Sequence, residues 1–220
     1  MAFDFETTLQ KYADLIVHVG LNVRAGQKLI IRAPIQAAPL ARLVTVSAYK
    51  AGARLVDVLY SDEDITLARF EHAPRDSFEE ISAYRLKVLE EYAAAGDAML
   101  SIYAENPDLL KDQDSNLVGI ATKTTAKHAR PYFELITKNS TNWCVVSIPI
   151  PSWAAKVFPG ISPDEQMAKL WDAIFEVTRL KHDDPVALWK EHIRQLESRT
   201  DMLNNKNYTA LKYRGPGTDL

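Results

Sequence analysis

Four short runs of apolar and β-branched residues, separated by segments of helical periodicity, constrain the fold of this chain most strongly. Runs of this length that end at glycine or proline predict buried strands. The segments between them are long enough to return the chain to the same end of a sheet, as parallel βαβ units require. The runs are KLIIRA at 28–33, RLVDVLYS at 54–61, DAMLSIYA at 97–104 and NWCVVSIPI at 142–150. We therefore predict an α/β fold with an open, mostly parallel sheet that has helices on both faces and four buried strands.

Capping residues, glycines and prolines delimit the predicted helices. The side chain of Asp62 is expected to cap one helix and that of Asp114 another. Proline is unfavourable inside a helix, so Pro131 is expected to begin a short helix of its own. The predicted helices cover residues 4–19, 39–51, 62–69, 78–95 (as one or two helices), 114–129 and 131–136.

After Pro151 the alternation of strands and helices ends, and the sequence predicts helices that follow one another without an intervening strand. Ser162 and Glu165 match a capping box at the start of a strongly amphipathic helix, and Asp184 with Pro185 repeats the start signal. This pair of helices is expected to form a hairpin against the sheet edge. An alternating strand at 206–214 and a turn at 215–217 follow, and this pattern predicts that the chain is part of a longer protein.

Composition excludes several classes of function. There are 26 Lys and Arg residues against 29 Asp and Glu residues, a formal net charge of -3, so no basic field is available to attract nucleic acid or an anionic membrane surface. The single cysteine, Cys144, lies in an apolar run and is interpreted as a core thiol in a reducing compartment. No signal peptide or membrane span is recognisable, and we therefore expect a cytoplasmic protein.

The residues that could carry catalytic chemistry do not form a recognised motif. No G-x-S-x-G elbow or Walker loop occurs, and the first strand is followed by RAPIQAAPLAR, which lacks the glycines of a dinucleotide site. We therefore predict no catalytic, cofactor-binding or metal-binding residue in this chain. The densest group of potential ligands is interpreted as helix-end and surface residues, and comprises His182, Asp183, Asp184, Glu191 and His192.

Three other groups of residues are interpreted structurally. The four tryptophans lie on apolar stripes and are expected to form core or inter-domain contacts. The carboxylate pairs at 79–80 and 90–91 are expected to face solvent. Backbone amides at 215–217 could bind an anion, although a tight turn explains these residues equally well. The tryptophans are Trp143, Trp153, Trp171 and Trp189.

The order of four stretches resembles the N-terminal half of the metalloaminopeptidases typified by aminopeptidase T and aminopeptidase S. These stretches are GLNVRAGQKLIIRAP, AYKAGARLVDVLYSDEDI, the W-x-x-K-V-F-P run at 153–159 and LKYRGPGTDL at the end. The second and last are the most specific, because a generic α/β domain does not require them. Together the four stretches span nearly the whole chain.

The resemblance implies a cytoplasmic, homodimeric enzyme that removes N-terminal residues from peptides. Two divalent metal ions, zinc or cobalt, would activate a bridging water for attack on the first peptide carbonyl. The ligands of these ions would lie in a second domain, so none transfers to this chain and none is expected to bind to it. Residues 1–208 would form the N-terminal domain, a scaffold with part of the dimer contact, and 209–220 would begin the metal-binding domain. The segment alone is expected to be inactive.

Two alternatives remain open from the residues themselves. The chain could be a self-contained binding module that holds a small ligand or a protein at the carboxyl ends of its strands, near 33–36 and 61–64. It could instead serve as a dimerisation domain that uses the apolar helices after Pro151.

Overall fold

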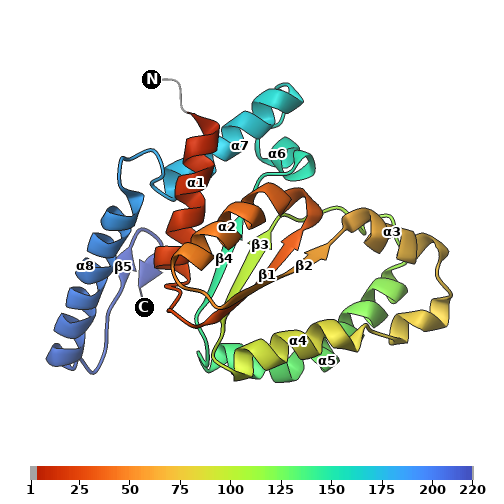
Figure 1. The fold of residues 1–220 in the computed structure, drawn as a ribbon, viewed down its shortest axis with the longest axis horizontal. Coiled ribbons are helices and arrows are strands. Elements are labelled where there is room, and N and C mark those ends of the chain that lie inside the picture. Colours follow the sequence, from red (N-terminus) through yellow and green to blue (C-terminus); the bar gives the residue numbers. More distant parts are fainter. Residues whose placement is uncertain (1–3, 220) are drawn as a thin grey trace.

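The computed structural model describes residues 4–219, so Leu220 and the first three residues lie outside the described range. A four-stranded parallel sheet forms the centre, in the order β2-β1-β3-β4, with helices on both faces (Figure 1). The predicted α/β class is therefore confirmed. The strands are β1 (Lys28–Pro34), β2 (Leu55–Ser61), β3 (Ala98–Tyr103) and β4 (Trp143–Ser147).

The helices lie close to the segments that the sequence predicts. The side chains of Asp62, Asp114 and Asp184 cap α3, α5 and α8, as expected. The helices are α1 (Phe5–Leu15), α2 (Ala38–Lys50), α3 (Glu63–His72), α4 (Ala83–Ala94), α5 (Ser115–Thr137), α6 (Pro151–Val157), α7 (Pro163–Val177) and α8 (Pro185–Lys206), with a π-helical turn η1 (Ile16–Gly20) and 3-10 turns η2 (Ile35–Ala37) and η3 (Arg75–Glu79).

Alternation along the central strands builds a separate apolar core on each face of the sheet. Leu29 and Ile31 of β1 point into the larger core, which includes residues of α1, η1, α2 and α7. Ile30 points to the opposite face, where it packs with Tyr92 of α4 and Tyr132 of α5. Because successive strand residues face opposite sides, one buried strand stabilises both layers.

The prediction of four buried strands is wrong for the two edge strands. β1 and β3 are almost fully buried, whereas β2 and β4 alternate between exposed and half-buried residues. On β4 the side chains of Trp143 and Val145 are 46% and 56% exposed. An edge strand has a neighbour on one side only, so its run of apolar residues does not ensure burial.

The prediction of a helix break at Pro131 is also wrong. Helix α5 continues from Ser115 to Thr137 with Pro131 inside it. Proline removes the backbone donor that would have reached the carbonyl of Lys127. Both residues are exposed, so water is available to that carbonyl, and the helix passes through the proline.

The C-terminal helices form as predicted but pack differently. Helix α7 begins with the expected capping box of Ser162 and Glu165. Helix α8 lies along α1 and η1, while α7 packs on α6, so α7 and α8 meet mainly near their junction instead of along a hairpin (Figure 1). There the indole nitrogen of Trp189 donates to the carbonyl of Thr178 at 2.9 Å.

The end of the described chain contains less strand than the alternation at 206–214 predicts. Residues up to Lys206 belong to α8, and only Arg214–Gly215 (β5) and Thr218–Asp219 (β6) pair, as an antiparallel hairpin. Gly217, at a φ of 77°, lies with Pro216 in the turn of this hairpin, whereas Gly215 belongs to β5, so a tight turn is present within 215–217. A single alternating stretch does not form a ladder without a neighbouring strand.

Candidate functional site

The strand order places a topological switch point between β1 and β3. The chain passes from β1 to β2 on one side of β1, and later to β3 and β4 on its other side. All four strands are parallel, so their carboxyl ends lie at one edge of the sheet. In open α/β sheets the loops diverge at such a point and leave a crevice for a ligand.

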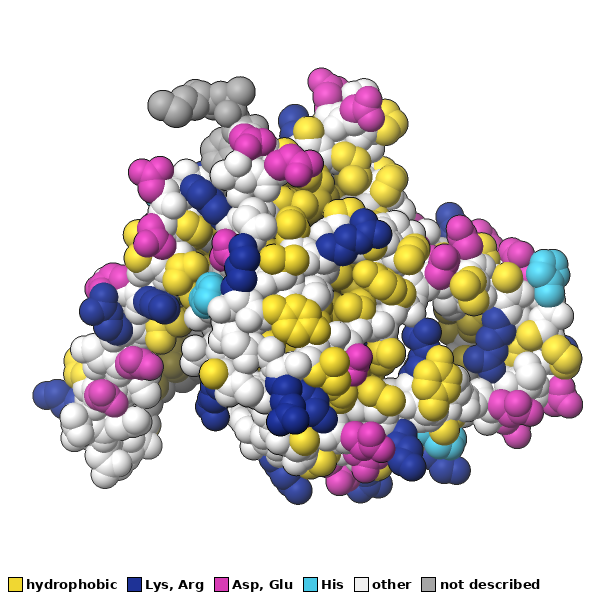
Figure 2. Space-filling model, viewed as in Figure 1, with side chains coloured by type: hydrophobic (Ala, Val, Ile, Leu, Met, Phe, Trp, Pro, Cys, Tyr) yellow, Lys and Arg dark blue, Asp and Glu magenta, His cyan; other side chains and the backbone are white. Residues whose placement is uncertain are grey.

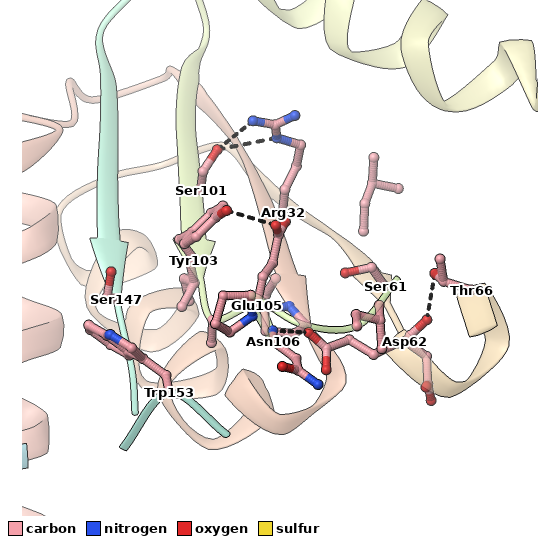
Figure 3. A pocket seen from close by; sticks show the side chains of 18 of the residues that line it. Arg32, Ser61, Asp62, Thr66, Ser101, Tyr103, Glu105, Asn106, Ser147 and Trp153 are labelled. Atoms are coloured by element: carbon pink, nitrogen blue, oxygen red, sulfur yellow. Dashed lines mark hydrogen bonds between the residues drawn. The ribbon is translucent and has the colours of Figure 1, made fainter. Parts of the chain in front are cut away.

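A pocket of about 1010 Å³ lies at this edge of the sheet (Figure 3). From the two predicted regions, 33–36 and 61–64, the lining includes Ala33, Pro34 and residues 61–63. Ile35, Gln36 and Asp64 are not among the lining residues. The remaining polar or aromatic side chains of the lining are Arg32, Thr66, Arg85, Ser101, Tyr103, Glu105, Asn106, Ser147 and Trp153.

Arg32 and Ser101 lie side by side on β1 and β3, where the register pairs them. The Nε and Nη2 atoms of Arg32 both donate to the Oγ atom of Ser101, at 3.2 and 2.7 Å. The guanidinium lies over the ring of Tyr132 of α5, 5.6 Å from its centroid. The arginine is half-buried and held in place by a hydroxyl and an aromatic face.

The acidic side chains of the pocket hold the loop that follows β3. The backbone N–H of Asn106 donates to Glu63 at 2.5 Å, which ties this loop to the start of α3. The hydroxyl of Tyr103 donates to Glu105 at 2.7 Å, and this hydrogen bond raises the pKa of the tyrosine. Both carboxylates therefore keep one side in contact with the protein while they line the pocket.

Arg32, Ser101 and the loop 103–106 were not predicted from the sequence as site residues. One signal was present, because Arg32 is a charged residue within an otherwise apolar predicted strand, and a buried charge requires a partner. Ser101 could not be predicted as this partner, because the two residues are neighbours only through the pairing of β1 with β3, and the sequence does not give the strand order.

The predicted ligand-rich cluster near α8 does not form a metal site. Asp184 caps α8, and the ring of His192 packs edge-on against Trp189 at 5.6 Å. The backbone carbonyl of His182 accepts a hydrogen bond from Lys11. Across residues 4–219, no three His, Cys, Asp or Glu side chains are arranged to hold a metal ion. A divalent metal centre therefore does not fit the described part of this chain.

Cys144 is a poor candidate for a nucleophile. Its side chain packs against the larger core, and burial raises the pKa of the thiol. A thiol with a raised pKa carries little thiolate at neutral pH. The interpretation of Cys144 as a core thiol agrees with this position.

The other residues considered in the sequence fall into two groups. The carboxylates at 79–80 and 90–91 are exposed, as predicted. Trp153, Trp171 and Trp189 pack against the larger core, whereas Trp143 is largely exposed on β4 and is not a core residue. Among the helices of residues 4–219, none is long and apolar enough to cross a membrane.

The surface carries apolar side chains on α8 as well as on β4. Hydrophobic side chains are visible along α8 and in the centre of the molecule (Figure 2). Five apolar side chains of α8 are between 36% and 52% exposed. These residues are Leu188, Ile193, Leu196, Met202 and Leu203.

The chain is similar to known proteins over almost its full length. The sequence profile of the family described as thermophilic metalloprotease (M29) matches residues 5–220. Aminopeptidase 2 of Geobacillus stearothermophilus is 44% identical over 213 residues, which cover 97% of this chain and 52% of that protein. Aminopeptidase AmpS of Bacillus subtilis is 38% identical over 216 residues, 98% of this chain and 53% of that protein.

A solved structure agrees with these sequence matches. The wild-type AmpT from Thermus thermophilus superposes with a TM-score of 0.87 at 36% identity, and the match covers 98% of this chain and 53% of that one. The chain thus spans about half the length of the relatives it matches. The fold described above is therefore shared with one half of a larger protein.

Proposed function

Because the chain belongs to the thermophilic metalloprotease family M29, we propose that it is the N-terminal scaffold of a metal-dependent aminopeptidase. The observation that carries the proposal is the match of residues 5–220 to this family. The relatives that it matches are named aminopeptidases. In this proposal the whole protein removes N-terminal residues from peptides.

The proposal assigns the metal to another part of the whole protein. Residues 4–219 contain no group of three potential ligands suited to a metal ion, whereas the family is one of metalloproteases. We assign two divalent ions, zinc or cobalt, to that other part, and expect residues 1–220 alone to be inactive. Residues 1–208 then form the α/β scaffold, and 209–220, including the exposed β5–β6 hairpin, lead into the metal-binding domain.

The same proposal includes a homodimer in the cytoplasm. The exposed apolar side chains of α8 support a contact with another protein surface, since burial of apolar surface against a partner is favourable. The single cysteine, without a disulfide partner, supports a reducing compartment. Light scattering coupled to size-exclusion chromatography tests the homodimer: a mass of two chains would support it, and a mass of one chain would contradict it.

A chimera tests the scaffold role. Residues 1–220 are joined to the part of Aminopeptidase 2 of Geobacillus stearothermophilus that lies outside the matched region, and hydrolysis of aminoacyl-nitroanilides is measured with zinc or cobalt. We expect the chimera to hydrolyse substrate faster than that second part alone. A folded, metal-loaded chimera that is no faster than the second part would contradict the scaffold role.

A further inference from the structure

The charged side chains around the pocket differ in their hydrogen-bond partners and in their exposure to solvent. Glu63 and Glu105 accept hydrogen bonds from Asn106 and Tyr103. Arg85 donates to the backbone carbonyl of Tyr60 at 2.9 Å. Each of these groups has a hydrogen-bond partner in the protein, and each has further donors or lone pairs beyond that one bond.

Unlike Arg85, which is exposed and also forms no ion pair among the described residues, Arg32 is half-buried. No ion pair of the residues 4–219 includes it, and its two hydrogen bonds go to a neutral hydroxyl. A guanidinium carries five N–H donors, so Ser101 leaves three of them without a protein acceptor. A half-buried cation without a counterion is unfavourable, and an anion in the pocket relieves that cost.

The edge of the guanidinium that Ser101 leaves free specifies the shape of this anion. Because Ser101 occupies the Nε–H and one N–H of Nη2, the three free N–H groups lie on Nη1 and Nη2, and these two nitrogens form a planar fork that can bind the two oxygens of a carboxylate in parallel. In the close-up the guanidinium lies beside Ser101 at one end of the pocket, and Asp62, Asn106 and Trp153 lie at the other (Figure 3). A ligand held at Arg32 therefore extends toward the loop after β3 and the start of α3.

The remaining charges restrict the rest of the ligand. The lining contains the carboxylates of Asp62, Glu63 and Glu105 and the guanidiniums of Arg32 and Arg85. With more acidic than basic groups around it, the pocket disfavours a ligand with several negative charges, such as a nucleotide phosphate. A single carboxylate at Arg32 and an ammonium group near the acidic side chains match this distribution.

We propose that the pocket binds a small zwitterion of dipeptide size, whose free carboxylate is held by Arg32 and Ser101 and whose ammonium group faces the acidic loop side. Its volume, about 1010 Å³, is ample for a dipeptide. Leu109, Leu110 and Trp153 supply apolar surface for its side chains. The inference rests on the pocket and not on the proposed hydrolase activity, since binding here needs neither metal nor hydrolysis.

Nuclear magnetic resonance titration of the 220-residue chain with the dipeptide Leu-Phe, without added metal, tests the site. We expect saturable shifts of the backbone amides of residues 32, 101 and 103. Leu-Phe amide lacks the carboxylate and should bind at least about tenfold more weakly, since charge-assisted hydrogen bonds are lost. N-acetyl-Leu-Phe lacks the ammonium group and should also bind more weakly, and inorganic phosphate should not compete.

Variants locate the carboxylate contact. Arg32→Lys keeps the charge but removes the fork, and should weaken Leu-Phe binding at least about tenfold. Arg42→Gln changes an exposed arginine of α2 outside the pocket and should leave binding unchanged. The proposal is overturned if no saturable shift occurs, if the amide binds as tightly as the acid, or if phosphate displaces Leu-Phe. These ligand comparisons need no variant, so they decide the matter even if Arg32→Lys does not fold.

Discussion

Gly20 lies directly against Cys144, because a Cβ atom placed on the glycine would lie 2.7 Å from the Sγ atom of the cysteine. This contact joins the end of η1 to the edge strand β4. A side chain at position 20 would have to push the strand or rotate the thiol. The absence of a Cβ atom at Gly20 therefore lets the opening helical segment pack closely on the sheet.

Gly20→Ala should lower the free energy of unfolding by about 1–3 kcal/mol, the usual effect of overpacking. Gly119→Ala is the matched control, because a Cβ atom there meets nothing within 4 Å and alanine favours the interior of α5. Urea denaturation measures both. Adding Cys144→Ala to Gly20→Ala should recover part of the loss. Equal losses with and without the thiol would show that the clash with Cys144 is not the cause.

Ser101→Ala should lower the free energy of unfolding by about 1–2 kcal/mol, because the half-buried guanidinium of Arg32 loses both of its hydrogen bonds. Ser147→Ala, on the same rim of the pocket, serves as the comparison. Thermal denaturation followed by circular dichroism should show a lower midpoint for the first variant only. Identical midpoints would mean that water replaces the hydroxyl at no cost.

Tyr12 should make the protein less stable in alkaline solution. Its ring is 3% exposed, its hydroxyl donates to the carbonyl of Ser147 at 3.1 Å, and burial raises its pKa well above the usual value. In the unfolded chain the phenol ionises near pH 10. Above that pH the unfolded state releases a proton that the folded state keeps, so stability falls by up to about 1.4 kcal/mol per pH unit.

Tyr12→Phe should therefore cost about 1 kcal/mol at pH 8, through the lost hydrogen bond, and progressively less as the pH rises past 10. Guanidinium denaturation between pH 8 and 11 gives the difference in the free energy of unfolding between the wild type and Tyr12→Phe. The titration of the other groups cancels in this difference. A difference that stays constant over this range would refute the assigned role of the phenol.

Pro131→Ala should raise the free energy of unfolding, because alanine restores the backbone donor toward the carbonyl of Lys127 and has the higher helix propensity. The gain should be about 1–3 kcal/mol, and less if α5 is bent to accommodate the ring. The control is Thr125→Ala, an exposed position of the same helix, which should change stability by less than about 0.5 kcal/mol. A loss of stability in Pro131→Ala would show that the proline is locally favourable.

Short sequence patterns predicted the helices and strands well. They failed to predict properties that depend on residues distant in the sequence, such as the burial of a strand. The capping box of Ser162 and Glu165 and the cap of Asp184 are both confirmed. Each depends only on a few consecutive residues, so the sequence was sufficient to predict it. The exposure of Trp143 depends on β4 being an edge strand, and strand order is not encoded in the run itself. Helix α5 continues through Pro131 because this residue is exposed to solvent. The helix propensity of proline does not take such exposure into account.

The candidate site was predictable in its place but not in its composition. Parallel strands imply a ligand crevice at their carboxyl ends, and the regions 33–36 and 61–64 were expected there. The polar residues of β3 and its loop, among them Ser101 and Glu105, join the pocket because β3 lies next to β1. The order of the strands in the sheet cannot be read from the separate apolar runs.

An assay of metal-dependent hydrolysis by residues 1–220 alone tests whether this chain lacks the metal site of the proposed aminopeptidase. Aminoacyl-nitroanilides are incubated with the chain and with Aminopeptidase 2 of Geobacillus stearothermophilus, each with added zinc or cobalt. We expect hydrolysis by the relative and none above background by this chain, since its described residues offer no set of metal ligands. Hydrolysis by this chain that appears with metal and disappears with a chelator would contradict it.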